Sequence, residues 1–180
     1  MSKKDNISES PVSAMEAAAK YLSSRMRTVS EVRDYLHSRG YSAEETDETV
    51  SELIGFRYLD DYQYALRYYE YNREKHRGSM RAARELAEKG IDPETVKYSR
   101  EDFLYTNKVD EYADALEIAL KEIGAEISYD LFDRDEDAEE TEKFQLDDRL
   151  SAKIARKLDG KGFERGDIYR VLEELRRRYE

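Results

Sequence analysis

The same pattern of apolar and polar positions occurs three times along the chain, each time ending at a glycine. Apolar residues stand eight and four positions before the glycine, a basic residue directly precedes it, and a hydrophobic residue follows it. The three glycines are Gly40, Gly90 and Gly162. Apolar residues four apart lie on one helix face, and a cation followed by glycine is typical of a helix C-terminus. Each copy therefore predicts a helix with its stop signal.

A second helical face follows each glycine. The positions 6, 10 and 13 residues further on are Thr46, Val50 and Leu53 in the first copy and Ile168, Leu172 and Leu175 in the third. The middle copy is the weakest, because Arg100 takes its central position. With only two Pro among 180 residues and abundant helix-forming residues, the chain is predicted to be all-α and built from tandem helical repeats.

Start signals mark where several of these helices begin. Thr28 with Glu31, and Ser42 with Glu45, have the spacing of a capping box. Asp92 followed by Pro93 predicts an N-cap with proline at the first helical position. Together with the stop signals they predict three helices in each repeat, joined by short turns.

We expect three tandem three-helix units in an elongated, curved molecule. The expected division is a flexible N-terminus at 1–13, a first repeat at 14–57, a second at 58–105 and a third at 106–180. The third contains an acidic insertion at 125–148, with eleven acidic residues against two basic ones. Such a charge run is typical of a solvated or disordered loop.

The composition excludes several classes of protein. Without cysteine the chain has no disulfide, thiolate nucleophile or cysteine metal site. It lacks an apolar run of the roughly 18 residues that a membrane span needs, and its first residues are polar, so we expect a soluble, cytoplasmic protein without a membrane partner.

No motif indicates a catalytic or metal site. Asp133, Asp135 and Asp137 are spaced like the start of a calcium loop, but Ala138 and Phe144 stand where that loop needs glycine and glutamate. The two histidines lie in different repeats without ligand partners at zinc spacing. We therefore expect no enzyme activity, no metal and no cofactor.

The segment between the first two repeats carries a family resemblance. It reads Tyr58-Leu59-Asp60-Asp61-Tyr62-Gln63-Tyr64-Ala65, and supporting matches are Arg77-Gly78 and Lys89-Gly90-Ile91-Asp92. In order and spacing these motifs resemble the RecX family of bacterial recombination regulatory proteins, from about residue 14 to residue 175. Two features differ from the family pattern: the chain is acidic overall, at −11, and Ser79 stands where proline is usual.

The resemblance implies a non-enzymatic regulator, and from the repeat pattern we expect a monomer. Such a protein binds the RecA recombinase filament and inhibits its growth, ATP hydrolysis and strand exchange, in DNA recombination, DNA repair and the SOS response. Weak binding of single-stranded DNA stays open. A free-standing helical DNA-binding protein and a helical adaptor are the alternative functions.

Basic residues are the candidate contacts with the recombinase or with DNA, since arginine forks suit both carboxylates and phosphates. The candidates are Arg25, Arg27, Arg33, Arg73, Arg77, Arg81, Arg84, Lys153, Arg156 and Lys157. The competing interpretation is a solvated surface paired with neighbouring glutamates. Among the tyrosines, Tyr62 and Tyr69 follow core spacing, whereas Tyr64, Tyr68 and Tyr71 are candidates for contact with a partner.

Overall fold

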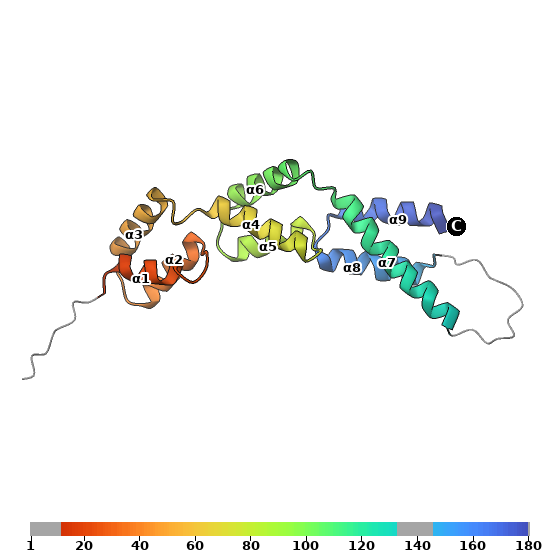
Figure 1. Cartoon of the computed structure of the whole chain (residues 1–180), viewed down its shortest axis with the longest axis horizontal. Coiled ribbons are helices and arrows are strands. Elements are labelled where there is room, and N and C mark those ends of the chain that lie inside the picture. The colour runs from red at the N-terminus through yellow and green to blue at the C-terminus, as the bar shows by residue number, and fades with distance from the viewer. Residues whose placement is uncertain (1–11, 133–145, 180) are drawn as a thin grey trace, which may run out of the picture.

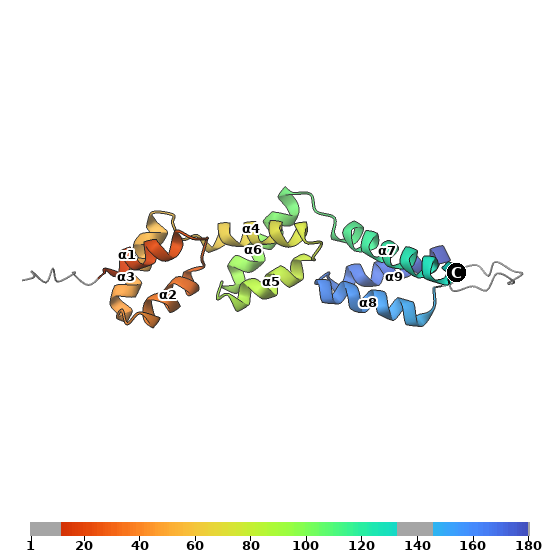
Figure 2. The same ribbon diagram turned by 60° about the horizontal axis from the view of Figure 1, so that its bottom comes forward.

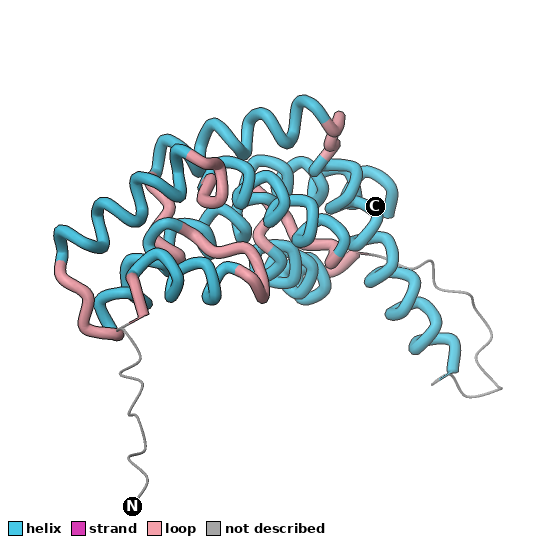
Figure 3. The backbone as a smooth tube through the Cα atoms, turned by 60° about the vertical axis from the view of Figure 1, so that its left-hand side comes forward, coloured by secondary structure: helices cyan, strands magenta, loops and turns pink. Residues whose placement is uncertain are grey.

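The computed structural model describes residues 12–132 and 146–179, with the side chains of 126–132 left out. All secondary structure in these ranges is helical (Figure 3), which confirms the all-α prediction. The helices are α1 Ala14–Leu22, α2 Val29–Ser38, α3 Ala43–Gly55, α4 Asp61–Glu74, α5 Ser79–Glu88, α6 Pro93–Thr106, α7 Glu111–Phe132, α8 Asp148–Lys161 and α9 Arg165–Tyr179.

The helices pack in consecutive groups of three, each around its own core. We name these groups the first bundle (α1–α3), the second bundle (α4–α6) and the third bundle (α7–α9). Fully buried residues at the three centres include Leu36, Tyr69 and Leu158. The bundles follow one another in an elongated, curved row (Figure 1), with the middle helices α2, α5 and α8 along one edge (Figure 2).

Local signals set most helix ends as expected. Thr28 and Ser42 each accept a hydrogen bond from the backbone N–H three residues on, and the glutamate there completes the capping box. Asp92 caps α6 ahead of Pro93. The three repeat glycines have φ of +88°, +80° and +86°, in the left-handed region that glycine favours.

The acidic insertion was placed too early in the chain. α7 continues to Phe132, so residues 125–132 are helical and not loop. The stretch from Glu126 to Phe132 holds only two of the acidic residues and has apolar residues four apart, which favours continuing the helix. The C-terminal turns of α7 project beyond the rest of the third bundle (Figure 1). At its other end the expected loop ran to 148, whereas Asp147 is already the N-cap of α8, which begins at Asp148. Residues 133–145 lie outside the described residues.

Two expected boundaries also shift slightly. Residues 1–11 of the expected flexible N-terminus lie outside the described residues, but Ser13 is the N-cap of α1, in a capping box with Glu16. The second repeat was expected to end at 105, yet α6 continues to Thr106, because the backbone N–H of Asn107 still donates to Phe103 O. We propose that the domains of the chain meet at the α3–α4 and α6–α7 joints.

Successive bundles meet through the same pair of contacts. At the first junction Thr28 Oγ1 donates to Lys89 O at 2.9 Å, and the N–H of Val29 donates to Asp61 Oδ1 at 2.9 Å. The N-terminus of α2 therefore contacts both the C-terminus of α5 and the first turn of α4.

The second junction repeats this arrangement one bundle further on. The N–H of Gly78 donates to Lys161 O at 2.9 Å, and the N–H of Ser79 donates to Glu111 Oε1 at 2.6 Å. The middle helices therefore stand head to tail, so that positive and negative dipole ends face each other. The otherwise unpaired N–H groups at their starts are satisfied by the next bundle.

Glycine allows the close approach at both junctions. A Cβ at Gly90 would lie 2.4 Å from Ser30 Oγ, and one at Gly162 would lie 2.2 Å from the Cβ of Arg81. On the opposite side, a Cβ at Gly78 would lie 2.2 Å from Gly162 O. Gly40 has the same backbone conformation with nothing within 4 Å. Only the second and third of the repeat glycines are thus needed for docking.

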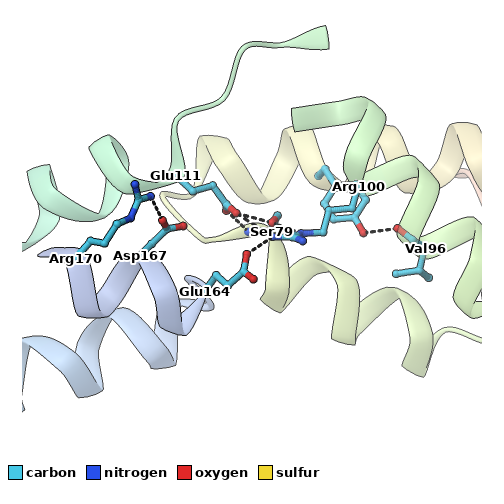
Figure 4. A network of polar contacts seen from close by, with 8 residues as sticks. Ser79, Val96, Arg100, Glu111, Glu164, Asp167 and Arg170 are labelled. Carbon is cyan, nitrogen blue, oxygen red and sulfur yellow. Dashed lines mark hydrogen bonds and ion pairs between the residues drawn. The ribbon is translucent and has the colours of Figure 1, made fainter. Parts of the chain in front are cut away.

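Arg100 adds a polar network to the second junction (Figure 4). Its Nε donates to Ser79 Oγ at 2.6 Å, and its Nη2 lies 3.3 Å from Glu111 and 3.2 Å from Glu164. The Ser79 hydroxyl in turn donates to Glu111 at 2.7 Å. The residue that weakened the middle repeat in the sequence is therefore a contact between the second and third bundles.

The first junction contains a testable electrostatic cost at Asp61. Burial raises the pKa of Asp61, and the nearby acids Asp92, Asp60 and Glu31 add to this against the hydrogen bond from Val29. A raised pKa means that the folded state holds this proton more tightly than the unfolded chain does. This contribution to stability is therefore lost as pH rises from the ordinary carboxyl range through the folded pKa.

We expect Asp61→Asn to stabilise the protein at neutral pH. Asparagine keeps an oxygen that can accept from the N–H of Val29 but carries no charge to bury. In urea unfolding, the variant should have a higher free energy of unfolding than the wild type at neutral pH. In acid the two values should be equal. Asp34→Asn, at an exposed position, controls for the change in net charge. A variant that is less stable at neutral pH would show that the charge itself holds the junction.

Candidate functional site

The ten basic candidates fall in three regions and do not form one surface. Those in the first bundle lie in the connection between α1 and α2 and within α2. Those in the second bundle lie on α4, on α5 and in the turn between them, and those in the third bundle lie on α8. Only Arg73, Arg77 and Lys157 line one recess together. The others are engaged elsewhere or point separately to solvent.

That recess, the interbundle cleft, lies where the end of α4 meets α7 and α8. It has a volume of about 460 Å³. The side chains that carry positive charge there come from three segments of two bundles: Arg73, Arg77, Lys121, Lys157 and Lys161. Asp114 and Glu117 are the carboxylates of the lining, and Ile118 and Phe163 are its apolar residues. The cleft is thus a cationic recess in an acidic protein.

The cations of the interbundle cleft are only partly neutralised. Arg73 Nε lies 4.0 Å from Asp114, and Lys121 Nζ lies 2.5 Å from Glu117. Lys161 Nζ donates to His76 O at 3.2 Å. The guanidinium of Arg77 is half-buried and forms no hydrogen bond or ion pair with any described residue, although its charge helps to lower the pKa of Glu85 at longer range. Arg73 and Arg77 are therefore the least satisfied groups of the cleft.

Arg81 is mainly a junction residue. Its Nε pairs with Glu85 at 2.8 Å, and its Nη1 donates to Gly160 O at 3.0 Å in the next bundle. Hydrogen bonds from Tyr68 and Arg81 lower the pKa of Glu85 although burial opposes them, and burial next to Glu85 raises the pKa of Tyr68 to about 12. Arg81 is thus held in place by contacts within the protein.

Arg84 and Arg156 are the candidates most available to a partner. Each stands six residues before its repeat glycine, on the exposed face of α5 and of α8 respectively. Neither forms a hydrogen bond or ion pair with a described residue. The first bundle has Asp34 at this position, so this repeat position carries a positive charge in the second and third bundles alone.

Most of the remaining basic candidates form ion pairs with carboxylates of the protein itself. Arg25 pairs with Glu31 at 3.2 Å, and Arg33 pairs with Asp47. Lys153 lies 3.1 Å from Glu122, which also pairs with Lys157. These two lysines lower the pKa of Glu122. The basic side chain of each pair is exposed, so the pairs contribute little to stability, about 0–1 kcal/mol each, and the cations can exchange their partners.

Arg27 belongs to a stack of cations and rings on the first bundle. Its guanidinium lies 4.0 Å from the Tyr21 ring centre, Tyr21 stacks on Tyr35 at 4.1 Å, and Arg39 lies 5.2 Å from the Tyr35 ring on the other side. A guanidinium is attracted to the face of an aromatic ring. No sequence pattern indicates this arrangement, since the four residues come from three different segments.

The tyrosine predictions hold only in part. Tyr69 is buried as expected, but Tyr64, a candidate contact, is also buried, with 8% of its surface exposed. It packs in the core of the second bundle together with Ala65 and Tyr69, so the apolar face of α4 is wide enough to include it. Tyr71 is 47% exposed and keeps its place as a candidate. Tyr62 is half-buried and donates to Asp102 at 3.1 Å.

Two recesses of the structure are lined by residues at equivalent positions of the repeat, which the sequence patterns above did not reveal. A second recess, of about 400 Å³, lies between α1 and α2. Measured from the repeat glycines, its residues Tyr35, Arg39 and Tyr41 correspond to Lys157, Lys161 and Phe163. Along the first helix of each bundle, and just past the end of α1, both recesses use positions with the spacing 0, 3, 4 and 7, counted from Ala17 and from Asp114. Alignment of the repeats by their glycines would have found this signal.

Among the described residues, no helix is both long and apolar enough to cross a membrane. In the same ranges, no three acidic or histidine side chains come together in a way that suits a metal ion. The candidate sites among the described residues are therefore built from charged groups, stacked rings and hydrogen bonds.

Comparison with known proteins gives the same family as the sequence motifs. A family model described as RecX, first three-helix domain, matches residues 14–53. Regulatory protein RecX of Bacillus licheniformis is 34% identical over 105 residues, which cover 58% of this chain and 40% of that protein. Its counterpart in Bacillus thuringiensis is 29% identical over 160 residues, covering 88% of this chain and 52% of that protein. This chain thus spans about half the length of these relatives or less.

The solved structures extend the likeness over most of the fold. The crystal structure of RecX from Lactobacillus salivarius has a TM-score of 0.69 at 26% identity and covers 90% of this chain and 94% of its own. A second crystal structure of regulatory protein RecX, at 23% identity and a TM-score of 0.62, supports the fold. In its first three-helix domain by sequence, and over most of its length by fold, the chain is similar to the RecX regulatory proteins.

Proposed function

We propose that this protein binds the RecA recombinase filament and inhibits its growth, ATP hydrolysis and strand exchange. The observation that carries this is the likeness to RecX proteins, which the comparison with a RecX crystal structure extends along 90% of the chain. The RecX motifs of the sequence imply the recombinase as partner.

The shape of the molecule suits a filamentous partner. Three bundles in a curved row present a long surface (Figure 1), which spans more than one subunit of a helical assembly more readily than a compact domain does. The two polar junctions fix how the bundles follow one another. Contact at several points along such a row adds affinity without any single strong site.

The exposed face of α5 and α8 is the part of the surface that we assign to this contact. Arg84 and Arg156 occupy equivalent repeat positions there and have no partner among the described residues. Positive charges at a rim steer association with an acidic surface and are sensitive to salt. The arginines engaged within the protein, Arg81 above all, contribute by holding the bundles in place.

We expect Arg84→Glu combined with Arg156→Glu to weaken inhibition about tenfold, because charge reversal replaces attraction by repulsion at two points. DNA-dependent ATP hydrolysis by the cognate recombinase is measured against rising amounts of the full chain, at low and at higher salt. Lys97→Glu combined with Arg176→Glu makes the same change in net charge elsewhere. Circular dichroism checks that helicity is kept.

The assay tests the proposed function and the assigned binding surface separately. A wild-type protein without effect on hydrolysis or filament length contradicts the proposed function. If the wild type inhibits and the double variant inhibits equally well, the function stands but the assigned surface is wrong.

A further inference from the structure

The interbundle cleft contains more positive charge than the structure uses. Five cations line it against two carboxylates, and Lys157 also pairs with Glu122 outside the lining. The guanidinium of Arg77 is half-buried and forms no hydrogen bond or ion pair with a described residue, and Glu85 is the acid that its charge reaches at longer range. Placing a cation in such a recess is costly unless an anion completes it. The cleft therefore has the character of an anion site.

The cleft geometry favours a phosphate group over a carboxylate. The cations reach the recess from three segments: Arg73 and Arg77 from α4 and the turn after it, Lys121 from α7, and Lys157 with Lys161 from α8. A phosphate has acceptor oxygens in several directions, whereas the two oxygens of a carboxylate lie in one plane. The arginine forks and the lysine point charges are the groups that bind phosphate in proteins.

The neighbouring bundles favour nucleic acid as the source of the phosphate. In the first bundle the equivalent recess is lined by Tyr21 and Tyr35, stacked at 4.1 Å between two arginines. In the second bundle, Tyr68 lies 6.0 Å from the ammonium of Lys89, which directly precedes the repeat glycine. Single strands are bound by surfaces that combine cations with aromatic rings, because the strand alternates phosphates and bases.

We propose that the interbundle cleft binds a backbone phosphate of single-stranded nucleic acid, with Arg73 and Arg77 as its principal contacts. This site lies apart from the exposed α5 and α8 face assigned to the recombinase. Binding here does not depend on the recombinase, so this proposal and the proposed function can fail separately. It also explains how an acidic chain can touch DNA, since a local cationic recess outweighs net charge at short range.

The test is fluorescence anisotropy of a labelled single-stranded oligonucleotide titrated with the full chain at several salt concentrations. Wild-type binding should weaken with salt, because phosphate contacts release counterions. Arg73→Gln combined with Arg77→Gln should bind at least tenfold more weakly at low salt. Its log–log salt slope should be smaller by about 1.4, from about 0.7 for each lost contact with a single strand.

Lys97→Gln combined with Arg176→Gln is the matched control, since it removes two positive charges that do not line the cleft. Equal weakening in both double variants would overturn the proposal by showing a non-specific charge effect. Wild-type protein that does not bind the oligonucleotide would overturn it as well. Tighter binding of a polyglutamate peptide of similar charge would overturn it in favour of an acidic protein segment.

Measuring recombinase inhibition by the cleft variant distinguishes the failure of one proposal from the failure of the other. A cleft variant that loses the oligonucleotide but still slows ATP hydrolysis supports both assignments. Oligonucleotide binding without any effect on the recombinase supports the cleft and contradicts the proposed function.

Discussion

Gly162→Ala should separate the second and third bundles. The backbone at Gly162 has φ of +86°, where an L-residue costs about 1–2 kcal/mol. The added Cβ would also lie 2.2 Å from Arg81 Cβ and 2.6 Å from the Arg81 backbone nitrogen. Neither atom can move without displacing α5, so we expect a further 1–3 kcal/mol from overpacking or loss of the docked arrangement. Urea unfolding and small-angle scattering measure the two outcomes.

The other glycines provide controls that separate the two causes. Gly40→Ala carries the same backbone cost at φ +88° but meets nothing within 4 Å. Gly78→Ala has an ordinary backbone conformation, with φ of −69°, but its Cβ would lie 2.2 Å from Gly162 O. Gly40→Ala should therefore cost about 1–2 kcal/mol without a change of shape, whereas Gly78→Ala should affect the junction. Equal effects of Gly40→Ala and Gly162→Ala would refute the docking role.

The helices were predictable because their signals are local. Capping boxes such as that of Thr28 and Glu31 act over three residues, and the repeat glycines terminate their own helices. Core positions such as Leu36 and Leu158 followed from apolar spacing on one face. These interactions are decided by neighbours within one or two turns, and the sequence displays them directly.

The contacts between bundles were not predictable in this way. Thr28 and Lys89 are 61 residues apart in the sequence, and Arg81 and Gly160 are 79 apart. A charged residue at a helix position looks the same in sequence whether it faces solvent or the next bundle. Arg81 was therefore grouped with Arg84 as a contact, although one is held in a junction and the other is exposed.

The candidate site was only partly visible for the same reason. Arg73, Arg77 and Lys157 were named as basic candidates, but the cleft that they share needs two bundles docked against each other. The sequence signal that was available is the correspondence of positions before the repeat glycines. It relates Tyr35 in the first bundle to Lys157 in the third, and so places an aromatic recess and a cationic recess at the same point of the repeat.

Removal of the Glu111 side chain should destabilise the second junction more than any surface charge change. Glu111 has only 10% of its side chain exposed and accepts hydrogen bonds from the N–H of Ser79, the Ser79 hydroxyl and Arg100. In Glu111→Ala the buried N–H of Ser79 is left without an acceptor, which costs about 1–3 kcal/mol. Arg100 also loses its less exposed partner, and urea unfolding should register both effects.

Glu164→Ala is the control, because it also removes one carboxylate that pairs with Arg100. The Glu164 side chain is 57% exposed and lies 3.2 Å from Arg100, so its loss should cost no more than about 1 kcal/mol. Since Arg77 and Lys157 reach the interbundle cleft from different bundles, a loosened junction also spreads the cations apart. Glu111→Ala should therefore lower oligonucleotide affinity while Glu164→Ala leaves it unchanged. Equal stability of the two variants would show that the Ser79 amide finds another acceptor and that the network does not hold the bundles together.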